Sequence, residues 1–339
     1  MAVVESTARA LLVLAALVSG PAAAHHSYAM FNGTKTLTVK GTVAKLEWTN
    51  PHVFVWVYVP NPAAQSGFDL YAFENGSPNV LARGGWSPTT FAIGARVVVT
   101  GRPGRSGKST LFLETVRKAE TTAPLFDSTV LRAAAPSRAS EPATSIFGTW
   151  LTFVGPAFFN LIPPAVAQAA TPRGAAAFAA YRDAEGPGAD CVPYSAPLYM
   201  SFPGFRRIEQ RDGVVVIRGE DTAVDRVVHL DVATHDGAPP SVQGHSIGRW
   251  DNGVLVVDTA QFTPHLLGNG AGLPSGPGKR LIERFALNTE GGLTYAFELE
   301  DAEFVQGRLT GTAQWVLRPD VEFEVTPCDR SNARRFLAE

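Results

Sequence analysis

The sequence has little charge of either sign. Charged residues make up 18% of its 339 residues, and the formal net charge is −2. No basic stripe stands out along the chain, and proteins that bind nucleic acid usually do so by neutralising phosphates. We therefore expect no nucleic-acid partner. The length favours two domains, and the many glycines (32) and prolines (25) favour loop-rich β structure over helix.

Long apolar runs are also scarce, and the one near the N-terminus is short. Arg9 precedes the apolar residues Ala10 to Val18, and Ala22-Ala23-Ala24 provides a small-residue cleavage site. Residues 1–24 are therefore predicted to be a signal peptide, because the run is too short to cross a bilayer. We expect cleavage near Ala24-His25, a periplasmic or secreted protein, and no membrane span in the mature chain.

Cysteine is nearly absent, and only Cys191 and Cys328 occur. An even pair in an oxidising compartment favours a disulfide. That bridge would close a long loop, and loop-closure entropy then stabilises the fold by up to about 4–5 kcal/mol. Two unpaired thiols are the alternative.

The first domain is predicted to span residues 25–120. Alternating apolar residues and turn signals give three strands, a short helix and two strands. These elements are Thr36–Trp48, His52–Val59, Phe68–Glu74, the helix from Ser77-Pro78 to Arg83, Ala95–Gly101 and Thr110–Arg117. A helix between the third and fourth strands is typical of an OB-like five-stranded barrel. Phe54, Trp56 and Tyr58 share one strand face, as a stacking platform or a packing surface.

Several motifs of this domain resemble a known family. They are His25-His26-Ser27, Lys40-Gly41-Thr42-Val43, Glu47-Trp48-Thr49-Asn50-Pro51-His52-Val53 and Phe73-Glu74-Asn75-Gly76-Ser77-Pro78-Asn79. The family is DUF6152, small exported bacterial proteins of unknown function. The resemblance covers the whole domain. It implies export and a small β fold, and it brings no established activity.

The mature N-terminus is a candidate copper site. Cleavage after Ala24 would make His25 the first residue, with an α-amine and an Nδ1 that together can chelate Cu(II). His26 or His52 would supply a further imidazole, a ligand type that suits copper. A solvated, frayed terminus is the alternative.

Residues 121–145 are rich in Ala, Ser, Thr and Pro and are predicted to be a linker, followed by a second domain over residues 146–339. After a short helix at Arg173–Arg182, strands and turns dominate. The predicted strands are Phe205–Gln210, Val214–Arg218, Val224–Asp231, Gln243–Trp250, Val254–Phe262, Arg280–Leu287, Thr294–Glu300, Thr312–Arg318 and Val321–Val325. Such a series indicates an antiparallel meander closed into a lipocalin-like barrel, or a split sandwich. A barrel of this size can hold one apolar small molecule.

The hairpin around Asn252-Gly253 gives the most specific prediction. This dipeptide favours a two-residue type I′ turn, which places His245, Arg249 and Asp258 on one face. We expect that face to point into the barrel, where the three residues would form a catalytic group. A register-fixing ion pair is the alternative, and a three-residue loop would separate the side chains.

Three further residues are candidate ligand contacts. Glu283 shares a strand with apolar residues and points either into the barrel or outward. His265 lies in the loop Thr263–Lys279, which would be a lid or a disordered segment. Trp250 lies at the end of the strand that also carries His245.

The second domain also resembles an uncharacterised exported bacterial β-domain. The resemblance rests on Asp190-Cys191-Val192-Pro193, Gly244-His245-Ser246-Ile247-Gly248-Arg249-Trp250, Leu255-Val256-Val257-Asp258-Thr259, Glu283-Arg284-Phe285 and Trp315-Val316-Leu317-Arg318-Pro319-Asp320. Such domains usually carry a His-Pro-His-Ser-like stretch in the loop, where this chain has Gly272-Leu273-Pro274-Ser275. A shared metal or acid–base role for the loop is therefore in doubt, which favours His245.

Three functions remain open. The first is an exported ligand-binding or scaffold protein with two β modules. The second is an enzyme of the isomerase, hydratase or cyclase type, with His245 as acid–base group, Asp258 orienting it, and Arg249 or Glu283 holding a polar group of the substrate. The third is a copper-binding protein. The sequence contains no complete phosphate-binding loop.

Overall fold

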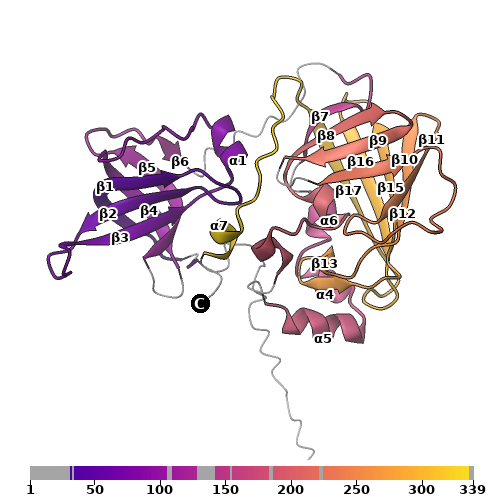
Figure 1. Ribbon diagram of the computed structural model, residues 1–339, viewed down its shortest axis with the longest axis horizontal. Coiled ribbons are helices and arrows are strands. Elements are labelled where there is room, and N and C mark those ends of the chain that lie inside the picture. The colour runs from indigo at the N-terminus through magenta and orange to yellow at the C-terminus, as the bar shows by residue number, and fades with distance from the viewer. Residues whose placement is uncertain are drawn as a thin grey trace, which may run out of the picture.

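The computed structural model describes residues 31–32, 34–104, 109–127, 142–152, 155–182, 186–220 and 224–335. Two β-barrels lie side by side, and the C-terminal segment, residues 318–335, runs between them (Figure 1). The predicted signal peptide, His25 and His26 lie outside the described residues. The predicted fold class, mainly β with two barrel modules, is confirmed.

The first barrel is a closed five-stranded sheet with one added strand. Its strands run in the order β3-β2-β1-β4-β5, and a parallel pairing of β3 with β5 closes the ring. The elements are β1 (Leu37–Glu47), β2 (Phe54–Pro60), β3 (Phe68–Glu74), α1 (Pro78–Arg83), β4 (Arg96–Pro103), β5 (Thr110–Lys118) and β6 (Phe126–Asp127). Because α1 falls between β3 and β4, the element order is the predicted OB-like one.

Alternation along β2 separates the two faces of this barrel. Val55 and Val57 are buried in its core. Phe54 and Trp56 point outward and lie beneath the guanidinium of Arg335, 5.4 and 5.5 Å from the two ring centres. The aromatic face is therefore partly covered by the C-terminal segment, which makes it a packing surface at that end.

The second barrel has nine strands. They run in the order β10-β11-β12-β15-β16-β17-β7-β8-β9, and the sheet is closed. They are β7 (Gly148–Thr152), β8 (Gly204–Arg211), β9 (Val214–Gly219), β10 (Asp225–His229), β11 (His245–Asp251), β12 (Val254–Ala260), β15 (Arg280–Leu287), β16 (Leu293–Glu300) and β17 (Arg308–Leu317). A ring with an odd number of strands cannot alternate direction throughout, so one neighbouring pair must be parallel. That pair is β10 and β11, joined by residues 230–244.

Short elements cover one end of the second barrel (Figure 1). They are α3 (Pro156–Phe159), α4 (Ala165–Gln168), α5 (Pro172–Ala180), η3 (Pro187–Asp190), α6 (Leu198–Ser201), and the β13 (His265–Gly270) and β14 (Leu273–Ser275) hairpin. The predicted helix is α5, whose first turn is capped by the Thr171 hydroxyl accepting from the Gly174 amide at 3.0 Å. None of the helices described in these ranges is long and apolar enough to span a membrane.

Two predictions for the second domain are wrong. The loop Thr263–Lys279 is not the disordered segment that was one of its two predicted forms, because β13 and β14 pair within it. Residues Val321–Val325 form no strand. Val321, Phe323 and Val325 are partly buried and alternate with exposed residues, but none of the described strands pairs with this segment.

The predicted hairpin register is confirmed. Asp251 pairs with Val254, Arg249 with Val256 and His245 with Ala260. The turn residues Asn252 and Gly253 have φ angles of +48° and +84°, as a type I′ turn requires.

We expect Gly253→Ala to lower the free energy of unfolding by about 1–2 kcal/mol, because an alanine at positive φ is strained. Nothing lies within 4 Å of a Cβ added there, so the effect would come from the backbone alone. Urea unfolding followed by circular dichroism measures it. Asn252→Gly is the control and should cost much less. An unchanged midpoint for Gly253→Ala would contradict this account of the turn.

Candidate functional site

The polar face of the β11–β12 hairpin lies on the outside of the second barrel. Leu255 and Val257 alternate with Asp258 along β12 and are fully buried in the core, whereas Arg249 is exposed. The predicted inward orientation of His245, Arg249 and Asp258 is therefore wrong. Both faces of β12 are apolar in sequence, so the alternation did not distinguish inside from outside.

Asp258 and His245 nevertheless belong to one cluster. His235, from the connection between β10 and β11, lies between them. Its Nδ1 is 3.0 Å from Nδ1 of His245, and its Nε2 is 3.7 Å from an Asp258 oxygen. His229 stacks on His245 with ring centres 5.0 Å apart. We name His229, His235, His245 and Asp258 the histidine cluster.

Arg249 does not complete this cluster. The guanidinium that binds Asp258 belongs to Arg280 on β15, at 3.1 and 2.5 Å. Partial burial lowers the pKa of His245, and the neighbouring His229 and His235 lower it further. Sequence reasoning missed His235 because nothing local indicates that the connection between β10 and β11 folds back over β11.

The interior of the second barrel contains a buried ion pair. Glu283 is fully buried and accepts two hydrogen bonds from Arg226, one of them 2.9 Å long. The Tyr295 hydroxyl also donates to Glu283, at 2.9 Å. Burial first, and then the Glu283 carboxylate, raise the pKa of Tyr295 well above its ordinary value. Of the two orientations open for Glu283, the inward one is present.

Hydroxyl groups and aromatic rings surround this pair. Arg226 also donates to the hydroxyls of Ser246 and Thr259, at 3.3 and 3.0 Å. Large buried side chains occupy the rest of the core, namely Trp150, Phe285, Tyr295, Phe297 and Trp315. The polar groups of Glu283 are thus engaged by the protein itself.

His265 is part of the hairpin that closes one end of the barrel. Its Nε2 lies 3.2 Å from the Pro193 carbonyl, and its Nδ1 accepts from the Leu267 amide at 3.1 Å. Burial, with the nearby Lys279, lowers the pKa of His265 to about 4. The neutral imidazole therefore acts as a structural link between two loops.

The buried ammonium group of Lys279 anchors the same β13–β14 hairpin by hydrogen bonds. Its Nζ donates to Ser195 Oγ at 3.0 Å and to the carbonyls of Ala196 and Gly268 at 2.5 Å. Burial lowers the pKa of Lys279 to about 7, against the attraction of Asp301. This contact explains why the glycine-rich segment is a fixed hairpin.

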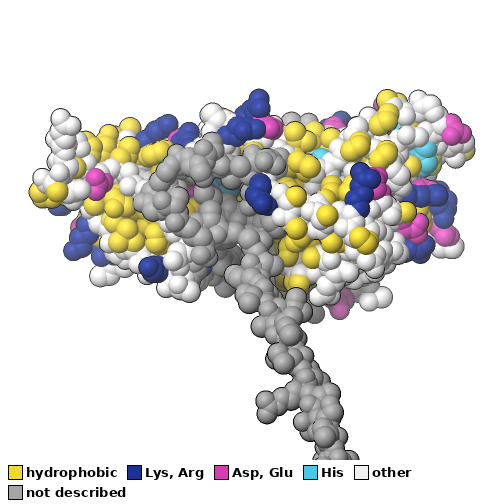
Figure 2. Space-filling model, turned by 90° about the horizontal axis from the view of Figure 1, so that it is seen from below, with side chains coloured by type: hydrophobic (Ala, Val, Ile, Leu, Met, Phe, Trp, Pro, Cys, Tyr) yellow, Lys and Arg dark blue, Asp and Glu magenta, His cyan; other side chains and the backbone are white. Residues whose placement is uncertain are grey.

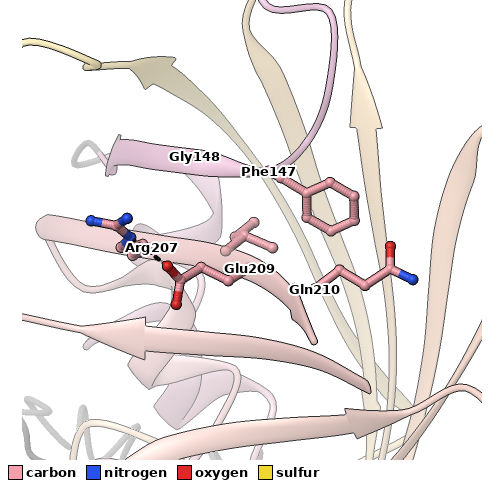
Figure 3. Close-up of a pocket in the computed structure, with 6 residues that line it drawn as sticks. Phe147, Gly148, Arg207, Glu209 and Gln210 are labelled. Atoms are coloured by element: carbon pink, nitrogen blue, oxygen red, sulfur yellow. Dashed lines mark hydrogen bonds and ion pairs between the residues drawn. The ribbon is translucent and has the colours of Figure 1, made fainter. Parts of the chain in front are cut away.

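Trp250 lies near a surface hollow. It is 43% exposed, and its ring contacts that of Phe147 at 6.1 Å. Phe147 and Gln210 project to the same side of the strands, and Arg207 pairs with Glu209 beside them (Figure 3). The hollow is lined by Phe147, Gly148, Arg207, Ile208, Glu209 and Gln210.

His52 lies at the boundary between the barrels. Its Nδ1 is 3.2 Å from a Glu74 oxygen and 3.3 Å from the Asn75 carbonyl. Asn332 binds the His52 carbonyl at 2.9 Å. In the described part of the chain, no group of three or more His, Cys, Asp or Glu side chains is arranged to hold a metal ion.

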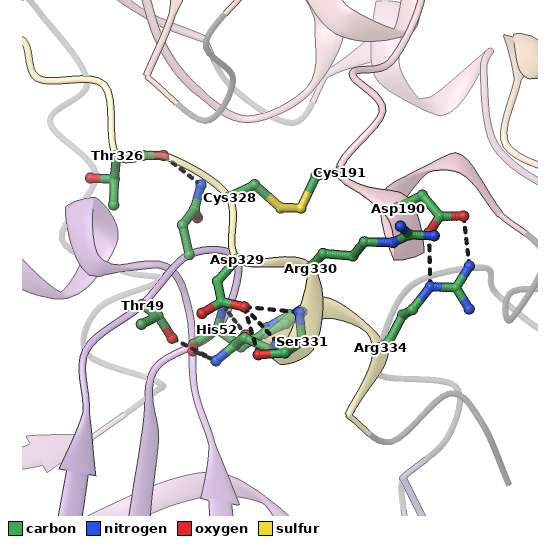
Figure 4. The surroundings of a disulfide bond; sticks show 12 residues. Thr49, His52, Asp190, Cys191, Thr326, Cys328, Asp329, Arg330, Ser331 and Arg334 are labelled. Atoms are coloured by element: carbon green, nitrogen blue, oxygen red, sulfur yellow. Dashed lines mark hydrogen bonds and ion pairs between the residues drawn. A yellow bond between two sulfur atoms is a disulfide. The ribbon is translucent and has the colours of Figure 1, made fainter.

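The predicted disulfide between Cys191 and Cys328 is confirmed, with an S–S distance of 2.08 Å. It joins the end of η3, in the second domain, to the C-terminal segment, residues 318–335. Beside it, the Asp190 carboxylate accepts from Arg330 at 2.5 Å and from Arg334 at 2.8 and 2.6 Å (Figure 4).

The other side of the C-terminal segment binds the first barrel. Asn332 donates to the Thr49 hydroxyl at 2.6 Å. Arg335 makes two hydrogen bonds to Glu47, at 2.5 and 2.6 Å. Burial alone would raise the pKa of Glu47, but hydrogen bonds from Arg335 and Trp56 hold it below its ordinary value. Arg83 and Glu220 bridge the barrels directly at 2.7 and 3.1 Å.

We expect Glu283→Gln to destabilise the second barrel by about 3–5 kcal/mol, because the Arg226 charge would stay buried without its partner. Guanidinium unfolding measures the change. The double variant Arg226→Met with Glu283→Leu removes both charges and should recover most of the loss. A single variant as stable as the wild type would show that the pair does not hold the core.

The pKa of His265 predicts a specific pH dependence. Because the folded pKa is about 4 and the ordinary value is 6.5, the unfolded chain binds the proton more readily between these values. This contribution to stability is complete above pH 6.5 and is lost as the pH falls to about 4, by about 3 kcal/mol. His265→Gln should flatten unfolding free energy against pH in that window. An equally steep profile in the variant would contradict the prediction.

One comparison with known proteins gives a match. Residues 13–112 match the model of a family described as a family of unknown function, DUF6152. The match ends within β5, so it covers most of the first barrel and confirms the resemblance of that domain. No curated protein matches the chain.

Proposed function

We propose that the protein is an exported scaffold, which presents the outer surfaces of two barrels and carries no cargo inside the second one. The observation that carries this proposal is the filled interior of the second barrel. The Glu283 carboxylate accepts hydrogen bonds from Arg226 and Tyr295, and the Trp150 and Trp315 side chains are also buried in this core. A carrier of an apolar small molecule needs an apolar cavity at this place.

The C-terminal segment supports the scaffold function. It binds Asp190 of the second domain and Glu47 of the first through arginine–carboxylate pairs. Paired guanidinium and carboxylate groups fix orientation as well as distance. A protein that must present two surfaces together needs a connection of this kind between its modules.

The disulfide supports the proposed export. Such bonds persist in oxidising compartments and are rare in the cytosol. The apolar run and small-residue site at the N-terminus suit the same destination, periplasmic or secreted.

Outer apolar side chains are the proposed places for partner contact. Hydrophobic side chains are visible on both barrels in Figure 2. On the first barrel, Tyr58 and Leu70 face each other across β2 and β3, and both are more than 40% exposed. The Phe68 ring meets that of Tyr58 at 4.5 Å. Exposed apolar groups that lie together are typical of interaction surfaces.

The filled interior can be tested with indole as an apolar probe. Trp315→Ala would leave a cavity of the shape of the removed ring, and engineered apolar cavities bind such molecules. We expect indole to raise the melting temperature of Trp315→Ala and not that of the wild type, since binding to the folded state stabilises it. Circular dichroism first establishes that the variant is folded, and Phe285→Ala is the substitute if it is not. Comparable stabilisation of the wild type would favour a carrier.

A further inference from the structure

The histidine cluster is an arrangement that the scaffold function does not explain. Its side chains come from β10, the connection 230–244, β11 and β12, on the outer face of the second barrel. The side chains of His235 and Asp258 are 18% and 24% exposed, so both are partly open to solvent. Four polar groups from separate segments meet here.

The two facing nitrogens of His235 and His245 constrain each other. Only one proton fits between nitrogens 3.0 Å apart, so one Nδ1 must offer a lone pair to the other. The Asp258 carboxylate, 3.7 Å from His235 Nε2, favours the proton on that nitrogen. His235 Nδ1 is then the unprotonated atom, and its lone pair points at His245.

Asp258 is itself held in place, because Arg280 donates hydrogen bonds to both of its oxygens. His235 Nε2 is buried without a hydrogen-bond partner, which leaves Asp258 as its nearest acidic neighbour. A carboxylate that accepts from the second ring nitrogen orients a metal-binding histidine, and Asp258 lies on that side of His235 at 3.7 Å, slightly beyond hydrogen-bond distance.

We propose that His235 and His245 bind a divalent transition-metal ion of the zinc class through their Nδ1 atoms, with Asp258 as the positioning residue. Nitrogens bound to a tetrahedral zinc ion at 2.0–2.1 Å lie about 3.3–3.4 Å apart. The observed 3.0 Å is a few tenths of an ångström short of that separation. A small rotation of either ring opens the site, and the proton between the rings moves to Nε2 of His245.

Two protein ligands make this an exchangeable site, with water in the remaining positions. Structural zinc sites use four protein ligands and catalytic ones three, so two ligands give weaker binding. His229, stacked on His245, is the further imidazole of the cluster. This site is separate from the N-terminal copper site expected at His25, and the scaffold function does not depend on it.

Calorimetric titration of the full chain with zinc chloride at pH 7.5 tests the proposal. We expect one ion per chain, and loss of that binding in both His235→Ala and His245→Ala. Asp258→Asn should weaken binding by about 10–100-fold, as removal of an orienting carboxylate does. His265→Gln, a histidine change in the same domain but outside the cluster, should bind as the wild type does.

Two controls separate the outcomes. The double variant His25→Ala with His26→Ala removes the terminal imidazoles and should keep the ion at the cluster. Imidazole nitrogen NMR signals of His235 and His245 should shift on zinc addition, whereas those of His265 should not. No binding by the wild type, or binding lost only in the terminal double variant, would overturn the proposal. His235→Gln replaces the alanine variant if that one fails to fold.

Discussion

The Cys191–Cys328 disulfide fixes the C-terminal segment at the point where it passes from one barrel to the other. The bond joins η3 to a stretch of chain that has already left β17. Asp190, next to Cys191, holds Arg330 and Arg334 on the same stretch. Without the disulfide and the Asp190 contacts, the segment would be held only by its hydrogen bonds to the first barrel, such as those of Asn332 and Arg335.

Because both sheets are closed into barrels, the C-terminal segment is important for joining the two modules. A closed barrel has no free edge to which the other barrel can add a strand, so the modules must meet through side chains and loops. Glu47, Thr49 and His52 supply those contacts on the first barrel. The interface is mostly polar and charge-paired, and such contacts fix orientation more than they add stability.

Closure of the second barrel also determines which of its polar side chains are exposed to solvent. The interior of the second barrel is occupied by the Arg226–Glu283 pair and aromatic rings. Polar groups that small solutes can reach therefore lie on its outer face, where His235 and Asp258 are found.

Local features were predictable from the sequence, and long-range ones were not. Asn252-Gly253 fixed the hairpin register because a type I′ turn depends on two neighbouring residues. Which face of that hairpin is buried was not predictable, because Val256 and Val257 are both apolar and both buried. Arg226 as the partner of Glu283 depends on a pairing 57 residues apart.

The glycine-rich hairpin and the histidine cluster were missed for related reasons. Residues 263–279 have few apolar side chains in alternation, and their structure depends on Lys279 donating to the Gly268 carbonyl of β13 and to the Ala196 carbonyl of a distant segment. His235 reaches His245 only because the parallel β10–β11 step needs a long returning connection. That step follows from the number of strands in the barrel, a global property.

We infer that the C-terminal segment and its disulfide make the two barrels tumble as one rigid body. Backbone ¹⁵N relaxation of the oxidised chain measures this most directly, because it gives a rotational correlation time for each barrel separately. We expect the same time for both, and a shorter time for the first barrel after Cys191 and Cys328 are reduced. A shorter time for the first barrel in the oxidised chain would contradict the claim.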